Sequence, residues 1–378
     1  MVTRITLTRA QTLFFLLSLP MLLRAFNRGV TRKPMSKLIK ETEPLGFPWF
    51  TMDPFLFCVF HEDFYPKGNE FLGPDEPLIG RNLGSDFTIK DGYRMYHGEV
   101  VPGFPGHPHR GFETVTVVNA GFVDHADSMG AAGRYGGGDT QWMTAGGGVQ
   151  HSEMFPCLKR DKGNHLELFQ IWLNLPKKDK MVDPYFTMLW RENLPRWTET
   201  NAAGKEADIQ LVAGRIGEHC PPPPPPNSWA ADPANDVMIL GVKLQEGATW
   251  TMPAASGPEI NRVLYFFKGE EVRLGEEAVS RHRAYVLRAD RGFEVEALAG
   301  EVRCLVLQGR PIGEPVVQHG PFVMNTRREI MQCFEDYQRT EFGGWPWDSR
   351  DVTHGPDRGR FARHADGREE EPDDSPAT

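Results

Sequence analysis

The sequence predicts an all-β protein made of two β-barrels in tandem, with one short helix near the C-terminus. Short segments that alternate apolar and polar residues recur through the middle of the chain, for example 112–118 and 166–173. Turns rich in glycine and proline separate them, and the chain holds 39 Gly and 31 Pro. Many short strands at such spacing are typical of a sandwich or barrel. The length of 378 residues allows two to three domains at roughly 150 residues each.

The composition excludes several classes of protein. With 40% hydrophobic and 25% charged residues, the chain is neither a polytopic membrane protein nor a collagen nor fully disordered. Its formal charge of -9 argues against direct binding of nucleic acid. The five cysteines include no C-x-x-C pair, which excludes a zinc ribbon and a disulfide-stapled miniprotein.

Residues 1–40 form a basic segment, which contains no Asp or Glu and eight Lys or Arg. Its apolar block, Leu13–Leu23, is shorter than the roughly 20 residues that span a bilayer. This composition favours a transit peptide for the mitochondrion or plastid in residues 1–34, with a signal, an anchor or a functionless extension as alternatives. Translation from Met35 would instead leave the protein in the cytoplasm or nucleus.

We expect the first barrel in residues 41–180 and the second in residues 181–313. The second region contains its own set of strand-like segments and a loop with six consecutive prolines, Pro221–Pro226. That run is interpreted as a loop insertion, and docking of an aromatic-groove module is the alternative. The strand-like segments of the second region are 237–243, 262–267, 271–274, 284–287, 293–297 and 302–307.

Residues 314–348 are expected to pack back on the barrels through one helix. The helix is predicted over Arg327–Arg339, where three large side chains fall on one stripe, and Asn325 or Thr326 would cap its N-terminus. Residues 349–378 have almost no large apolar side chains and end in an acidic run. We therefore expect them to form a disordered acidic tail.

The candidate metal ligands come from two short motifs. His107 and His109 are two residues apart, so in an extended strand both side chains point to the same face. His151 and Glu153 repeat this spacing further along the chain. Three imidazoles and one carboxylate would leave coordination positions open, as a catalytic metal requires. The alternative is that all four are ordinary surface or hydrogen-bonded core residues.

These motifs resemble the signature of the pirin family, which belongs to the cupin superfamily. The likeness extends over roughly residues 45–345 and is carried by residues 107–116, 138–146, 151–154, 173–176 and 313–326. The resemblance implies two cupin barrels (double-stranded β-helix, or jelly roll) face to face, with one Fe²⁺ in the N-terminal barrel. The second barrel has no H-x-H motif, and we expect it to bind no metal. It implies His107, His109, His151 and Glu153 as ligands, with Glu113 as a second-choice ligand.

The resemblance also implies an activity of the quercetin 2,3-dioxygenase type. Such an enzyme opens the central ring of a flavonol with O₂ and releases carbon monoxide. We expect Glu153 to serve both as ligand and as the base that removes the substrate's 3-hydroxyl proton. One alternative is a non-enzymatic, iron-dependent redox sensor that acts on a transcription factor, and another is a zinc-dependent sugar isomerase. We expect a monomer whose substrates are a flavonol-like aromatic molecule and O₂.

Overall fold

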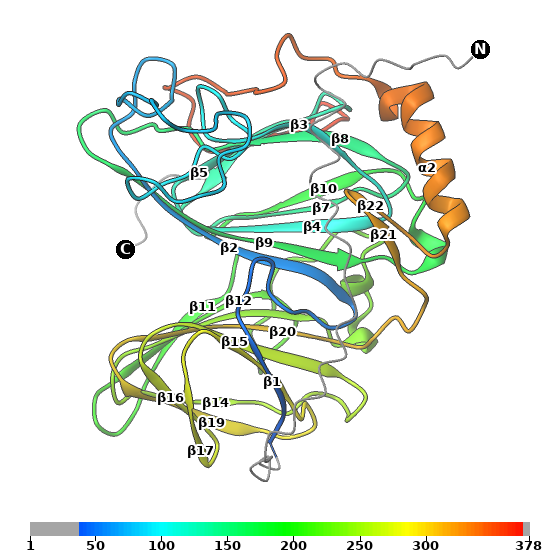
Figure 1. Cartoon of the computed structure of the whole chain (residues 1–378). Helices are drawn as coiled ribbons and strands as arrows, with labels where there is room; N and C mark the ends of the chain where they lie inside the picture. The colour runs from blue at the N-terminus through cyan, green and yellow to red at the C-terminus, as the bar shows by residue number, and fades with distance from the viewer. Residues whose placement is uncertain (1–37, 373–378) are drawn as a thin grey trace.

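The computed structural model describes residues 38–372. The predictions made for residues 1–37, including the transit peptide and the start at Met35, lie outside the described residues. Two β-barrels are stacked on one another, and the helix α2 (Arg327–Thr340) lies beside the first of them (Figure 1). Within residues 38–372, no helix is both long and apolar enough to cross a membrane. The predicted all-β architecture of two barrels is confirmed.

The first barrel is closed by a six-stranded and a five-stranded sheet, in which neighbouring strands run antiparallel. The six-stranded sheet has the order β24 (Glu369–Glu370), β23 (Phe361–Arg363), β6 (Ala132–Gly136), β5 (Phe122–Asp127), β8 (Val149–Met154) and β3 (Gly103–His109). The five-stranded sheet has the order β10 (Tyr185–Leu189), β7 (Thr140–Thr144), β4 (Phe112–Ala120), β9 (Asn164–Asn174) and β2 (Phe55–Tyr65).

The second barrel is built from a seven-stranded and a four-stranded sheet. The larger sheet has the order β1 (Ile39–Pro44), β18 (Arg283–Leu287), β15 (Asn261–Lys268), β20 (Val302–Gly309), β13 (Met238–Leu244), β12 (Glu206–Ala213) and β11 (Arg196–Thr200). The smaller sheet has the order β14 (Thr249–Met252), β19 (Phe293–Ala299), β16 (Glu271–Leu274) and β17 (Glu277–Ser280). Pro221–Pro226 lies in the connection between β12 and a short 3-10 helix, Trp229–Ala231.

A shared apolar core joins the barrels where the five-stranded and seven-stranded sheets face each other (Figure 1). Val115 and Val117 of β4 contribute to it from the first barrel, and Ile239 and Tyr265 contribute from the second. The ring of Trp49 stacks on Tyr265 with 5.2 Å between centroids. Strands such as β4 are therefore buried on both faces, because one face lines the first barrel and the other meets the second barrel.

The domain boundaries differ from those expected. Strand β1, assigned by sequence to the first barrel, pairs with β18 of the second barrel, with Thr42 opposite Tyr285. Strand β10, assigned to the second barrel, pairs with β7 of the first, with Thr187 opposite Trp142. The expected ranges 41–180 and 181–313 misplace both strands. A strand's own pattern shows which face is buried, whereas its partner is set by which sheet edge remains open.

The predicted C-terminal helix is confirmed as α2, one residue longer than expected. Thr326 is its N-cap, since its hydroxyl accepts a hydrogen bond from the Glu329 amide at 3.2 Å. The buried side chains Ile330 and Cys333 pack against the hairpin formed by β21 (Val317–His319) and β22 (Phe322–Met324).

The expectation of a disordered tail over 349–378 is wrong for residues 349–372. Strand β23 pairs with β6, with Ala362 opposite Gly133. The buried Arg134 side chain donates to the carbonyls of Gly355 at 2.8 Å and Arg358 at 2.6 Å. Composition indicates only how little apolar surface this segment can bury, whereas backbone pairing and a buried guanidinium hold it in place.

Candidate metal centre

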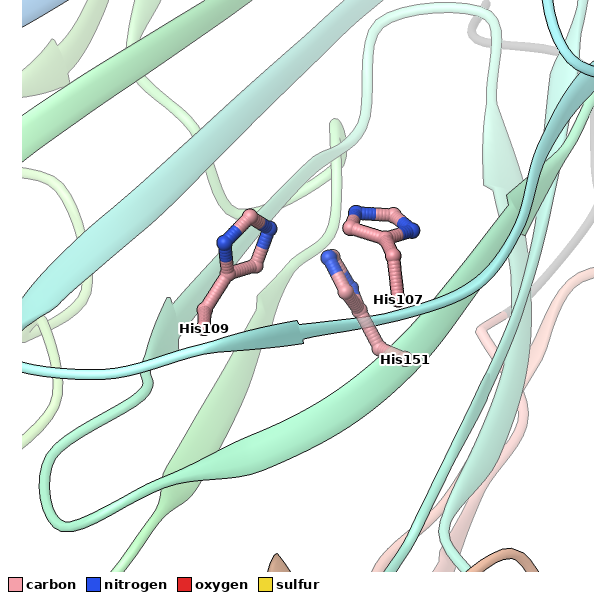
Figure 2. Close-up of side chains that lie close together, drawn as sticks. All are labelled: His107, His109 and His151. Carbon is pink, nitrogen blue, oxygen red and sulfur yellow. The ribbon is translucent and has the colours of Figure 1, made fainter. Parts of the chain in front are cut away.

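Three histidines converge inside the first barrel, from the two neighbouring strands β3 and β8. His107 lies directly opposite His151 in the antiparallel register, and His109 shares the face of His107 because side chains alternate along a strand. The ring centroids are 4.8 Å apart for His107 and His109, 4.5 Å for His107 and His151, and 4.9 Å for His109 and His151. Figure 2 shows the three rings turned toward one another. One ligand nitrogen from each lies within 4.8 Å of the others, so the cluster could hold a metal ion.

The environment of the three rings keeps them neutral, and it leaves several of their nitrogens without a hydrogen-bond partner. Burial lowers the pKa of His107 to about 4, and burial together with the neighbouring imidazoles holds the pKa values of His109 and His151 well below the ordinary value. Both ring nitrogens of His151 and Nδ1 of His109 are buried without a hydrogen-bond partner. Unpaired buried polar atoms are costly, and neutral imidazole is the form that binds metals. These residues therefore fit a metal centre.

A backbone carbonyl also orients the ring of His107. Its Nδ1 lies 3.0 Å from the carbonyl oxygen of Pro105. When Nδ1 carries the proton, it donates to this carbonyl and leaves Nε2 free to bind. Such a contact from the second ring nitrogen is the usual way that a metal-binding histidine is held.

Glu153 lies beside the cluster, two residues after His151 on β8. Its Oε2 is 3.8 Å from Nε2 of His151, and its Oε1 accepts a hydrogen bond from Thr116 Oγ1 at 2.9 Å. Burial raises its pKa, although the hydrogen bond from Thr116 acts in the opposite direction. The group of atoms within mutual ligand distance comprises the three histidines, and Glu153 is adjacent to that group.

Glu113, the second-choice ligand, points away from this cluster. It is the second residue of β4 and shares a face with Val115 and Val117, which belong to the core between the barrels. Its two carboxylate oxygens accept hydrogen bonds from Thr144 and Ser228, each at 2.6 Å. The expectation of Glu113 as an alternative ligand is wrong, because alternation along β4 turns it to the outer face.

Sequence reasoning missed three polar side chains near the cluster. His125 of β5 lies opposite Glu153 in the sheet, and its ring centroid is 5.6 Å from that of His151. Thr116 of β4 bonds to Glu153, and the amide of the neighbouring Gln141 on β7 is buried without a partner. His125 stands two residues before Asp127 on β5, the same spacing as in the two ligand motifs, and this spacing was the one signal that could have pointed to it.

A second group of ligand atoms lies on the outer part of β2 and β9. It consists of Glu62, His165 and Glu167. Lys268 donates to Glu62 at 2.7 Å, and Arg303 pairs with Glu167 through both terminal guanidinium nitrogens, Nη1 and Nη2. Because both carboxylates are already neutralised by cations, this group is an ion-pair network that joins the two barrels.

Two stacked β-barrels, the first with a buried cluster of three histidines, define a protein of the two-domain cupin class. The chain belongs to the pirin family. The Pirin family model matches residues 78–173, and the model of the Pirin C-terminal cupin domain matches residues 239–343.

Similar proteins support this assignment. Pirin of Rattus norvegicus is 32% identical over 249 residues, which cover 64% of this chain and 78% of that protein. The Pseudomonas aeruginosa protein named "Putative quercetin 2,3-dioxygenase" is 38% identical over 237 residues, covering 62% of this chain and 78% of that protein. The crystal structure of quercetin 2,3-dioxygenase from Acinetobacter baumannii has a similar fold, with a TM-score of 0.61 and 24% identity over 81% of this chain and 98% of that chain.

Proposed function

We propose that this pirin is an iron-dependent oxygenase of the quercetin 2,3-dioxygenase type. His107, His109, His151 and Glu153 would hold one Fe²⁺ in the first barrel. The observation that supports this most directly is the three-histidine cluster, in which three buried ring nitrogens have no hydrogen-bond partner, with a carboxylate beside it. The relative in Pseudomonas aeruginosa, whose name includes this activity, supports the same reaction class.

The proposed reaction opens the central ring of a flavonol. One O₂ is consumed, both of its atoms enter the ring-opened ester, and one carbon leaves as carbon monoxide. A bound Fe²⁺ would supply the redox-active centre that the reaction of O₂ with an organic substrate requires. The buried site would hold the substrate in one orientation and exclude water, which lowers the entropic part of the barrier.

Glu153 is proposed to accept the proton of the substrate's 3-hydroxyl. A raised pKa suits a base that must take a proton near neutral pH. Thr116 holds one carboxylate oxygen, Oε1, while Oε2 lies on the side of His151. The chain thus provides a fixed acceptor next to the place where the phenolic oxygen would bind.

The test combines anaerobic metal analysis with oxygen uptake in the presence of quercetin. We expect about one iron per chain and quercetin-dependent uptake of O₂ with release of CO. Glu153→Gln should lose turnover far more than iron, whereas Glu335→Gln, the same change at an exposed position on α2, should lose neither. Iron without oxygen uptake would contradict the oxygenase and favour the redox-sensor function. Bound zinc would favour the isomerase.

A further inference from the structure

The segment that follows α2 crosses the outer face of the six-stranded sheet of the first barrel. We name residues 344–363 the strap. In Figure 1 it is the orange-to-red chain that leaves α2 and runs over the upper barrel. It contacts β5, β3 and β8, and it ends by pairing β23 with β6. The strap lies beyond residue 343, where the match to the C-terminal cupin model ends.

The strap is anchored on β5 at two points. Trp347 donates from its indole nitrogen to the carbonyl of Asp127 at 2.8 Å. The backbone amide of His354 donates to Asp124 at 2.9 Å, and its Nε2 lies 2.8 Å from the carbonyl of His125. Asp124 in turn is bound by the buried Arg134. These contacts fix the strap to the sheet on both sides of residue 350.

Arg350 bonds to the residues that directly precede two of the proposed ligands. Its Nη2 donates to the carbonyl of Gly106 at 2.6 Å and to Oε1 of Gln150 at 2.7 Å. The Gly106 amide donates to the carbonyl of Arg350 at 2.7 Å. Gly106 precedes His107 on β3, and Gln150 precedes His151 on β8. Since His151 points inward, alternation places Gln150 on the outer face, where the strap lies.

The β3 strand needs such support at this position. It is the edge strand of its sheet, and its register with β8 is irregular between Phe104 and His107. An irregularity of this kind leaves backbone groups without a partner in the neighbouring strand. Here both backbone groups of Gly106 are satisfied by Arg350. Packing is also close, since a Cβ at Gly106 would lie 3.2 Å from the ring of Trp345.

We propose that Arg350 is a positioning residue for the metal centre, which it stabilises by joining the two ligand strands from outside the barrel. The inference rests on the proposed metal site and adds that the strap sets its geometry. His107 and His151 belong to different strands, so their separation depends on how firmly β3 is held against β8. Removing a residue that orients metal ligands without binding the metal itself typically lowers metal affinity by a large factor.

The test measures the affinity of the full-length, metal-free protein for Ni²⁺ by competition with a chelator. We expect Arg350→Ala to weaken Ni²⁺ binding by about tenfold, the lower end of the effect of losing a residue that orients metal ligands. Arg350→Lys should recover part of the affinity, because an ammonium group can still donate to the Gly106 carbonyl. Arg368→Ala removes an exposed arginine after the strap and should bind like the unaltered protein.

A second readout separates positioning from general stability. The Co²⁺ absorption spectrum should change in Arg350→Ala and remain unchanged in Arg368→Ala, while the unfolding temperatures of the metal-free variants stay close. Equal affinities and identical spectra for Arg350→Ala and the unaltered protein would overturn the role of Arg350 and leave the metal site intact. Failure of the unaltered protein to bind Ni²⁺ or Co²⁺ would instead overturn the metal site itself.

Discussion

Ser228 of the second barrel donates a hydrogen bond to Glu113 of the first barrel, with 2.6 Å between Oγ and Oε2. Thr144 occupies the other carboxylate oxygen at the same distance. Burial raises the pKa of Glu113 to about 7. The contact between the barrels therefore includes a carboxyl group that titrates near neutral pH.

Glu113→Gln should remove a pH-dependent part of the stability. Between pH 4.5, the ordinary pKa, and about 7, the folded protein binds one more proton at this site than the unfolded chain. The free energy of unfolding therefore falls as pH rises through this range, and the total loss, reached above pH 7, is about 3 kcal/mol. Urea unfolding of both proteins should give similar free energies near pH 4.5, with Glu113→Gln the more stable at pH 8. Parallel profiles over this pH range would contradict the raised pKa.

Lys180→Met should destabilise the first barrel. The buried Nζ of Lys180 donates to the carbonyl of Gly111 at 2.7 Å, to Oδ1 of Asn174 at 2.6 Å and to the carbonyl of Val323 at 3.3 Å. Methionine would leave these acceptors unpaired, at a cost of about 3 kcal/mol. Denaturant unfolding measures the loss, and Lys178→Met, at an exposed position, is the control. A loss for Lys180→Met no larger than that of the control would show that the three contacts do not matter.

Thr116→Val should separate proton transfer from metal binding. Valine has nearly the shape of threonine but lacks the hydroxyl that bonds to Glu153. Losing this hydrogen bond should raise the activation free energy by about 1.4 kcal/mol, which corresponds to a tenfold lower kcat with quercetin. The iron content should stay unchanged. Steady-state oxygen uptake checks this, with Thr249→Val in the second barrel as control. Full activity of Thr116→Val would show that the Thr116 hydroxyl plays no part in proton transfer.

The two-residue repeat of a β-strand was enough to predict which candidate ligands share a face, whereas the sequence did not predict which strands pair with one another. That period predicted that His107 and His109 share a face, and the structure places both beside His151. To apply this repeat to Glu113, one must know where β4 starts after the turn that follows His109. Tertiary packing sets that starting point, so the sequence alone did not show which face Glu113 occupies. Strand β1 and the segment 349–372 were misassigned because their partners, β18 and β6, lie far away in the sequence.

The most direct test of the account is the metal stoichiometry of the purified full-length chain after anaerobic loading with Fe²⁺ and removal of excess metal. Plasma mass spectrometry should find about one iron per chain in the unaltered protein and almost none in His151→Ala, with His219→Ala in the second barrel as the control that keeps its iron. Equal iron in His151→Ala and the unaltered protein, or no iron in either, would contradict a metal centre at the three histidines.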